Sequence, residues 1–413
     1  MFGFHEKIIA AEKELLQPHI IFTKVFCSKL RNLGITLNQT QEDALSSQFK
    51  SYKEVSVKLN IDFSDEQLSE AGYCSEEELR PDLEAIIKNF PEFIEKFAGN
   101  FSENRLDLYI EVVEEMSGLI YKDLKSRMKD MVDDQLTLRS DYEKSIDKSW
   151  GSALDLLQGL IVIADEVTEN YMKRTDEEFK NDKVQQIIIP IQAKINQISK
   201  EILLLLRNGF ADGAQARWRS LHELSVIVDF IAQNGEDIAE RYILHEAIES
   251  YKSAKIHNEY CHRLGSTVIS NPDMFNLKKE HDNLISKYGN DYRSDYGWAA
   301  NVLKKPSFRD IEKSVNLDFS RPHYKEASTN IHGNASGVLN RLGLRPENNA
   351  LLAGASNIGL SNPGQSTVIF LTHSLEVLLS YNTNLDCLAI SKAIVMYSRK
   401  VESKFLEIEQ KLI

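Results

Sequence analysis

The sequence contains few of the residues that break helices or cross-link chains. Its 413 residues include 19 glycines and 9 prolines, little more than half of the ordinary share of about 12%. This scarcity excludes a collagen and argues against a low-complexity chain or a loop-rich β-sandwich. The four cysteines are scattered, without a C-x-x-C pair, at Cys27, Cys74, Cys261 and Cys387. Their spacing favours reduced thiols in a cytoplasm over a disulfide framework or a zinc knuckle.

Long hydrophobic runs are also absent. The longest ones cover 160–164, 187–191 and 202–206, whereas a membrane-spanning helix needs about 20 apolar residues. The first residues lack a basic region followed by an apolar stretch, so we expect no secretory signal. These absences predict a cytoplasmic protein that does not bind a membrane.

The common catalytic and nucleotide-binding signatures are missing as well. The chain has no P-loop, no G-x-G-x-x-G, no G-x-S-x-G and no H-E-x-x-H, which argues against the commonest nucleotide-binding, hydrolase and metalloprotease classes. Its 62 acidic and 49 basic residues give a net charge of −13. A protein that coats duplex DNA needs a basic surface instead.

Helical periodicity dominates the sequence, and it predicts an all-α, multi-helix protein. We expect an accessory or recognition region over 1–140 and a helical bundle domain over 150–413 that carries the candidate site. Ser64 with Gln67 and Ser75 with Glu78 have the spacing of capping boxes, and prolines at 81 and 91 are expected to punctuate the helices that follow. The other expected helices cover 3–33, 38–60, 106–131, 154–172, 184–207, 213–233, 238–264, 322–332, 366–381 and 385–411.

The helix expected over 213–233 carries the first candidate site. Arg219 and Glu223 are four residues apart and His222 is three from Arg219, so these side chains share one face that continues into apolar positions. Charged groups that lead into a core must be paired or must line a cavity. A structural Arg–Glu bridge that fixes helix packing and a polar pocket are both consistent with this pattern. Asp212 is expected to cap the start of this helix.

A second constellation lies on the helix expected over 322–332. Tyr324, Ser328 and His332 are spaced i, i+4 and i+8, so one face presents a phenol, a hydroxyl and an imidazole. Gly333 next to them would allow a ligand to approach the backbone closely. The histidine could move protons near neutral pH. The alternative is a hydrogen-bonded histidine that the helix dipole favours at a C-terminus.

The charge around this helix is locally positive. Eight basic and four acidic side chains occur between 304 and 345, and such a patch could attract a phosphate or single-stranded RNA. It could equally be a solvated surface or an interface with the acidic N-terminal region. The basic residues are Lys304, Lys305, Arg309, Lys313, Arg321, Lys325, Arg341 and Arg345.

A metal site is a weaker alternative. Glu259 and His262 have Glu-x-x-His spacing, but a di-iron bundle needs a second such helix and two further glutamates. We therefore read these residues as the polar face of a long helix, and we expect neither a metal nor a cofactor.

Two resemblances narrow the function. The runs 203–209 and 219–223, followed by Ser328, His332 and Gly333, resemble a bacterial family known as a domain of unknown function, over about 190–335. That resemblance implies a helical cytoplasmic domain whose Arg, Glu, Ser and His side chains converge. Arg217 and His222 are also similar to the R-x(4–6)-H signature of HEPN ribonucleases from toxin and phage-defence systems. This similarity implies a metal-independent nuclease that assembles its site across a dimer.

Together these patterns predict an intracellular bacterial stress- or phage-defence effector that acts on a phosphate-containing substrate, with RNA cleavage as the candidate reaction. Arg219, His222, Glu223, Ser328 and His332 are the candidate catalytic residues. The candidate ligand-binding residues are Tyr324, Lys325, Arg217 and Gly333. The alternative is a non-catalytic sensor that binds a small anionic ligand, or contacts a partner protein through its N-terminal helices. A homodimer fits either function, and a purely structural role for the polar pairs is a third interpretation.

Overall fold

Every regular element that the structure describes is a helix. The computed structural model describes residues 17–50, 59–99, 101–174, 181–333, 335–344 and 353–412, and these ranges contain no β-strand. The predicted all-α class is therefore confirmed. No helix within the same ranges combines the length and the apolar character that crossing a membrane requires. The chain divides into two compact units, Met1–Gln135 and Leu136–Ile413.

The first unit packs short helices around a phenylalanine cluster. Phe22, Phe26, Phe49 and Phe90 contact one another with ring centroids 5.6–6.2 Å apart, and such aromatic pairs add to the free energy gained by burial. The helices of this part are α2 (Pro18–Asn32), α3 (Gln39–Lys50), α4 (Asp65–Glu70) and α5 (Glu76–Gly99). The ends of the two helices expected over 3–33 and 38–60 fall partly outside the described residues.

The start of α4 confirms one sequence signal, and α5 corrects another. Ser64 and Gln67 form the predicted capping box. In contrast, α5 continues through both Pro81 and Pro91, although a proline inside a helix removes one backbone hydrogen bond and disfavours the helical turn before it. The expectation that these prolines interrupt the helix is therefore wrong. Tertiary packing of the apolar face of α5 outweighs the low helix propensity of proline.

The helix α6 (Phe101–Arg174) joins two segments that were predicted as separate helices, over 106–131 and 154–172. The interval expected between 131 and 154 is helical as well, although it contains Gly151. A glycine inside a helix costs only about 1 kcal/mol relative to alanine. Next to it, Trp150 is fully buried and packs on Phe405, with ring centroids 6.0 Å apart. Burial of this indole gives more free energy than the glycine costs.

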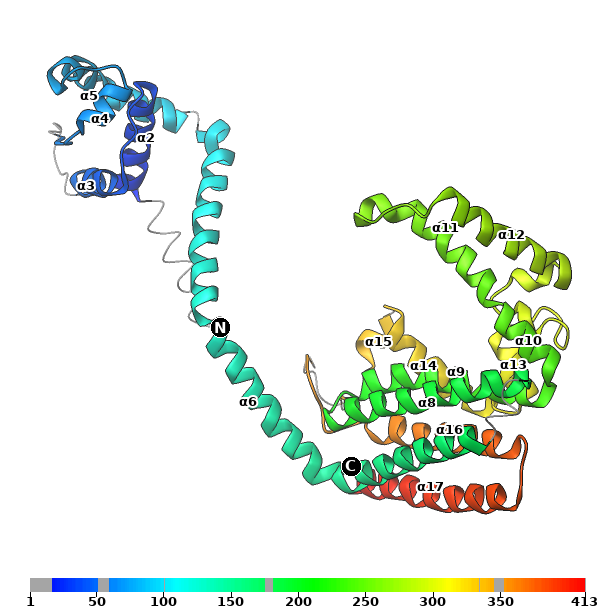
Figure 1. Cartoon of the computed structure of the whole chain (residues 1–413). Helices are drawn as coiled ribbons and strands as arrows, with labels where there is room; N and C mark the ends of the chain where they lie inside the picture. The colour runs from blue at the N-terminus through cyan, green and yellow to red at the C-terminus, as the bar shows by residue number, and fades with distance from the viewer. Residues whose placement is uncertain are drawn as a thin grey trace. The chain divides into compact units, whose positions relative to one another are not determined.

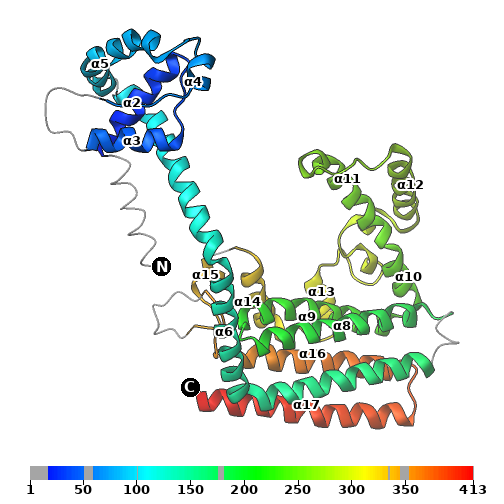
Figure 2. The same cartoon turned by 60° about the vertical axis from the view of Figure 1, so that its left-hand side comes forward.

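The second unit is built on a helical bundle. Figures 1 and 2 show α8 (Lys183–Arg207), α9 (Ala211–Asn234), α16 (Ser361–Ser380) and α17 (Leu385–Leu412) side by side with the last part of α6. The second half of α9 is buried as its composition predicts, since Leu221, Val226 and Phe230 have no exposed surface. This helix is therefore a rigid central support for the polar residues at its start.

The helix expected over 238–264 is divided in two at His245. It forms α10 (Glu236–Leu244) and α11 (Glu246–Leu264), and α11 pairs with α12 (Asn271–Tyr288), which was not predicted. The hairpin of α11 and α12 extends away from the bundle in both views (Figures 1 and 2). The buried His245 Nε2 contacts the carbonyl oxygens of Tyr292 and Ser294 at 3.1 and 3.0 Å. These contacts hold the chain at the division.

The segment that was expected to be irregular, 289–320, contains four short helices, of which one packs on α9. They are η1 (Asn290–Arg293), η2 (Gly297–Ala299), α13 (Phe308–Ser314) and η3 (Asp318–Ser320). The helix expected over 322–332 is present as α14 (Arg321–Ile331). It is followed by α15 (Ala335–Leu339). Both α13 and α14 pack against α9.

The close approach of α16 and α17 depends on Gly364. A Cβ atom at this position would lie 2.4 Å from Cε1 of the fully buried Phe405. We predict that Gly364→Ala lowers the free energy of unfolding by about 1–3 kcal/mol, because a packed core cannot take an added methyl group without strain. Denaturant unfolding measures this change. Gly354→Ala, whose Cβ would meet open space, is the control, and equal effects of the two substitutions would contradict the prediction.

Candidate functional site

The polar residues at the start of α9 point in two directions. Arg219 and Glu223 are one turn apart and lie next to each other on the helix. His222 precedes Glu223 by one position, so its side chain points about 100° away around the axis. The first pair meets α14, and His222 meets α13. We call the resulting set the Tyr324 cluster; its members are Arg219, His222, Glu223, Glu312, Arg321 and Tyr324.

The most deeply buried contact of the cluster joins His222 and Glu312. The Nε2 atom of His222 lies 2.8 Å from Oε1 of Glu312, and neither side chain has any exposed surface. Because a carboxylate accepts hydrogen bonds, Nε2 carries the proton and Nδ1 of the neutral ring is an acceptor. The other oxygen of Glu312 pairs with Nη1 of Arg321 at 2.9 Å. Glu312 thus orients the imidazole while Arg321 compensates its charge.

Aromatic rings enclose His222. Phe370 contacts it edge-on with centroids 4.4 Å apart, and Trp218 stacks on it at 5.3 Å. Phe308 and Tyr324 complete the enclosure at 5.8 and 5.6 Å. Burial among these rings lowers the pKa of His222 below its ordinary value, and the hydrogen bond to Glu312 opposes this effect only in part. The imidazole is therefore kept neutral near pH 7.

His222 Nδ1 has no hydrogen-bond partner among the described residues. The same is true of Trp218 Nε1 and of both amide atoms of Gln215, which is also fully buried. These residues are spaced i, i+3 and i+7, so they form one stripe along α9. An unpaired buried polar group costs about 1–3 kcal/mol, and such groups are commonly satisfied by buried water. The stripe therefore carries donor and acceptor atoms that a buried water molecule can satisfy.

The more exposed half of the cluster joins Arg219, Glu223 and Tyr324. Arg219 Nε lies 3.0 Å from Glu223 Oε1, and the Tyr324 hydroxyl donates to the same oxygen at 2.5 Å. Burial, together with the neighbouring Glu223 carboxylate, raises the pKa of Tyr324. The phenol is thus a fixed donor at any physiological pH. The pair predicted from the i, i+4 spacing is present, and Tyr324 is its partner on α14.

Two guanidinium groups pack against the ring of Tyr324. The Cζ atoms of Arg219 and Arg321 each lie 4.8 Å from its centroid, within the range of a cation–π contact. The side chains of these arginines are 23% and 37% exposed, so both reach solvent while Glu312 does not. Paired guanidiniums of this kind recognise phosphate and carboxylate oxygens.

The other candidate residues lie apart from the cluster. The Ser328 hydroxyl donates to the carbonyl oxygen of Tyr324 at 2.8 Å. His332 meets Ser328 only through the backbone, where its N–H donates to the Ser328 carbonyl oxygen at 3.1 Å, and no side-chain hydrogen bond joins the two among the described residues. His332 is exposed at the C-cap of α14, two turns and about 12 Å along the axis from Tyr324. Gly333 is exposed beside His332, whereas Lys325 is exposed about two turns before it, next to Tyr324. Arg217 faces α8, where it pairs with Glu201.

Glu312 and Arg321 belong to the site but could not be assigned to it from the sequence. Their segment, 308–321, has no long periodicity, and Glu312 is one of many acidic residues of the chain. The only available signal was the spacing of Ser307 and Asp310, which form a capping box at the start of α13. That signal locates a helix without indicating that Glu312 is buried.

Asp212 does not cap α9 as predicted. The N-cap residue is Phe210, without a side-chain hydrogen bond. The Asp212 carboxylate instead accepts from the backbone N–H of Leu342 at 2.9 Å and pairs with Arg341 Nε at 3.4 Å. It turns away from its own helix because the segment after α15 supplies a donor and a cation.

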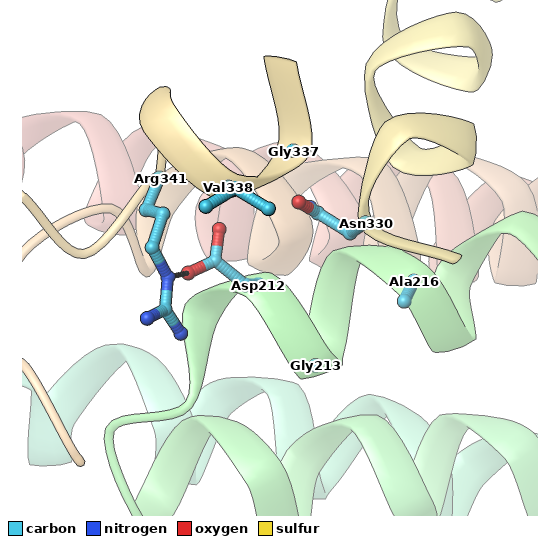
Figure 3. A pocket seen from close by; sticks show the side chains of 7 residues that line it. All are labelled: Asp212, Gly213, Ala216, Asn330, Gly337, Val338 and Arg341. Atoms are coloured by element: carbon cyan, nitrogen blue, oxygen red, sulfur yellow. Dashed lines mark ion pairs between the residues drawn. The ribbon is translucent and has the colours of Figure 1, made fainter. Parts of the chain in front are cut away.

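A pocket of about 290 Å³ adjoins this ion pair. Figure 3 shows the Asp212 carboxylate and the Asn330 amide facing each other beneath α15. The remaining walls come from small or apolar residues of α9 and α15 and from Arg341. The full lining consists of Asp212, Gly213, Ala216, Asn330, Gly337, Val338 and Arg341. This pocket lies at the opposite end of α14 from the Tyr324 cluster.

Within the described ranges, no group of three or more His, Cys, Asp or Glu side chains is arranged to hold a metal ion. Glu259 and His262 of α11 are both exposed.

Residues 185–350 match a family of unknown function, DUF5677. The match begins in α8 and extends past α15, so it contains the whole Tyr324 cluster and the pocket. Neither a curated protein nor a solved structure shows a significant match to the chain. The resemblance to a domain of unknown function is thus confirmed, while the individual helix motifs and the similarity to HEPN ribonucleases stay predictions.

Burial of neutral His222 predicts a pH-dependent stability. A histidine has a pKa of about 6.5 when unfolded, and that of His222 is lower in the folded protein. Below pH 6.5 the unfolded chain binds the proton first, so stability present above that pH is lost on acidification, by up to about 1.4 kcal/mol per pH unit. We expect urea unfolding between pH 7.5 and 5 to show a steeper loss for the wild type than for His222→Gln. If the free energy of unfolding fell equally with pH in both proteins, the prediction would be wrong, since the other histidines are common to both.

The two carboxylates of the cluster differ in burial, which predicts different costs of removal. Glu312→Ala leaves the fully buried His222 without its hydrogen-bond partner and deprives Arg321 of its carboxylate, and it is expected to lower stability by about 3–5 kcal/mol. Glu223 is 30% exposed, so Glu223→Ala should cost about 1 kcal/mol. Chemical denaturation of both variants gives the comparison. A larger loss for Glu223→Ala would show that the exposed half supports the fold.

Proposed function

We propose that the second unit binds a phosphate-containing ligand, with single-stranded RNA as the favoured class, along a surface formed by α13, η3 and α14. We call it the α13–α14 surface; its cations are Lys304, Lys305, Arg309, Lys313, Arg321 and Lys325. The observation that carries the proposal is an exposed aromatic ring, Phe319, in the same stretch of the chain as these cations.

The cations of the α13–α14 surface are available to a ligand. Lys304, Lys305, Arg309, Lys313 and Lys325 are exposed. None of them lies within 4.0 Å of a carboxylate of another described residue, although, after the hydrogen bonds from Ser307, Lys313 and Arg309 help to lower the pKa of the neighbouring Asp310. Asp310, Asp318 and Glu326 are the exposed acidic residues of the same stretch. The surface is thus locally positive on a protein of net charge −13. Free cations next to the half-exposed Arg321 suit a phosphate chain.

Phe319 supplies the feature that distinguishes RNA from a simple anion. Its side chain is 64% exposed, and it stacks on the buried Phe370 with centroids 6.2 Å apart and planes inclined by 13°. Unpaired bases stack on exposed aromatic rings of this kind. Phe370 also contacts His222, so a base on Phe319 would lie against the outer side of the Tyr324 cluster.

RNA cleavage is a second candidate, and one observation favours it. A carboxylate orients His222 so that Nδ1 is an unpaired acceptor, which is the arrangement of a general base. In this mechanism Nδ1 takes a proton from the RNA 2′-hydroxyl as its oxygen bonds to the adjacent phosphorus, the bond from phosphorus to the 5′-oxygen breaks, and the proton passes on to that leaving oxygen. Arg219 stabilises the charge that develops on the phosphate. His222 is enclosed, so cleavage requires the ring of Tyr324 to move. His332 is accessible as it stands and is the other histidine to test.

We predict that the triple variant Lys304→Ser, Arg309→Ser, Lys313→Ser binds a short single-stranded RNA about tenfold more weakly at 0.1 M salt, with a salt dependence reduced by about 2 in slope. Phe319→Ala should lower the affinity by about 5- to 150-fold, the equivalent of one stacked base. Fluorescence anisotropy measures both.

The matched control removes the same number of lysines and arginines from α17, outside the proposed surface. It is the triple variant Lys392→Ser, Arg399→Ser, Lys400→Ser, whose three side chains are all exposed in the wild type. Unchanged RNA affinity in both triple variants would refute the proposal. Growth and RNA integrity in cells that express the wild type, His222→Gln or His332→Ala separate the two candidates. RNA that stays intact with every protein argues for binding alone, whereas cleavage lost in one folded histidine variant identifies the base.

A further inference from the structure

The pocket between α9, α14 and α15 has its own chemistry, and we infer that it binds a nucleobase, specifically guanine. The inference rests on the proposed RNA binding for its biological setting, but the pocket is distinct from the α13–α14 surface. It is defined by Asp212, Gly213, Ala216, Asn330, Gly337, Val338 and Arg341. Its volume of about 290 Å³ is at the lower limit of pockets that hold drug-sized molecules, which suits a single base.

The charges of the pocket select a neutral ligand. Asp212 and Arg341 stand side by side at 3.4 Å, so a phosphate would be repelled by the carboxylate and an amine by the guanidinium. A ligand that offers both donors and acceptors along one edge can satisfy both groups at once. Nucleobases have such edges.

The carboxylate narrows the choice among bases. Each carboxylate has about four acceptor positions, and Asp212 uses them for Leu342 N–H and Arg341 Nε, so two remain. Guanine presents two adjacent N–H donors, N1–H and the 2-amino group, next to the O6 acceptor. The two N–H groups can donate to the Asp212 carboxylate. The O6 atom can accept from the NH2 group of the Asn330 amide, which faces the carboxylate across the pocket (Figure 3).

Small residues make the space for a flat ring. Gly213 and Ala216 form the α9 wall, and Gly337 brings α15 close to α14, because a Cβ at Gly337 would lie 2.1 Å from the carbonyl oxygen of Thr329. Val338, which is exposed at the rim, provides an apolar contact for one ring face.

The position along α14 links the pocket to the proposed RNA surface. Arg321 begins α14 and Asn330 lies near its end, nine residues and about 14 Å farther along the axis. A strand of a few nucleotides can cover that distance, with phosphates at the first end and one base in the pocket.

The test is isothermal titration of the full-length protein with guanosine, inosine and adenosine. Inosine differs from guanosine only by the absence of the 2-amino group. We expect guanosine to bind about tenfold more tightly than inosine and adenosine not to bind, because one unpaired polar group on the protein costs about this factor. Asp212→Asn should remove the difference between guanosine and inosine.

Ala216→Leu, which fills the pocket from a helix position, should abolish guanosine binding. Ala232→Leu, the same change at a partly buried site of α9, is the matched control for folding and should leave binding intact. Guanosine binding that persists in a folded Ala216→Leu protein, or equal affinity for guanosine and adenosine, overturns the inference.

The failures of the two proposals are distinguishable. If RNA binds through the α13–α14 surface but guanosine does not bind, the pocket inference is wrong and the proposed function stands. If guanosine binds to the pocket and both triple variants bind RNA equally, the pocket is supported and the RNA surface is wrong.

Discussion

The hydrogen bond between His222 and Glu312 holds the irregular part of the second unit on its helical bundle. It brings a completely buried carboxylate from α13 to a completely buried imidazole on α9. A buried charge is tolerated only when it is paired and hydrogen-bonded, and Arg321 completes this requirement from α14. Glu312 therefore ties both α13 and the start of α14 to α9, together with the buried Phe308 and Ile311, and the Tyr324 cluster forms only when both helices are in place.

The same arrangement separates the cluster into a dry interior and a wet rim. His222 and Glu312 are shielded by Trp218, Phe308 and Phe370, whereas Arg219 and Arg321 reach solvent on either side of Tyr324. Electrostatic interactions in the interior are stronger than those at the rim. The buried pair of His222 and Glu312 can fix the positions of the helices. The arginines at the rim can exchange their carboxylate partners for the anionic groups of a ligand.

Local sequence signals predicted the helices better than their ends or their contacts. The capping box at Ser64 and the pair of Arg219 and Glu223 depend on spacing alone, and both occur as expected. Glu312 could not be found in this way, because its burial is decided by residues 90 positions away in the chain. Asp212 had the right residue type for an N-cap, but a donor and a cation beyond α15 compete for its carboxylate. Tertiary partners thus decide which of two local roles a polar residue takes.

The 90-residue separation of His222 and Glu312 has a consequence for how the chain can change. Between them lie α10, the α11–α12 hairpin and the short helices that follow. The helices of this segment keep their own packing, and the connection at the tip of the hairpin is 265–270. The entropy of closing a flexible connection depends on the logarithm of its length, so doubling this one would cost about 0.6 kcal/mol. Because the hairpin extends away from the bundle (Figure 2), its tip is a position where homologous chains can gain or lose residues, or a designer can insert a reporter domain, without changing the geometry around His222.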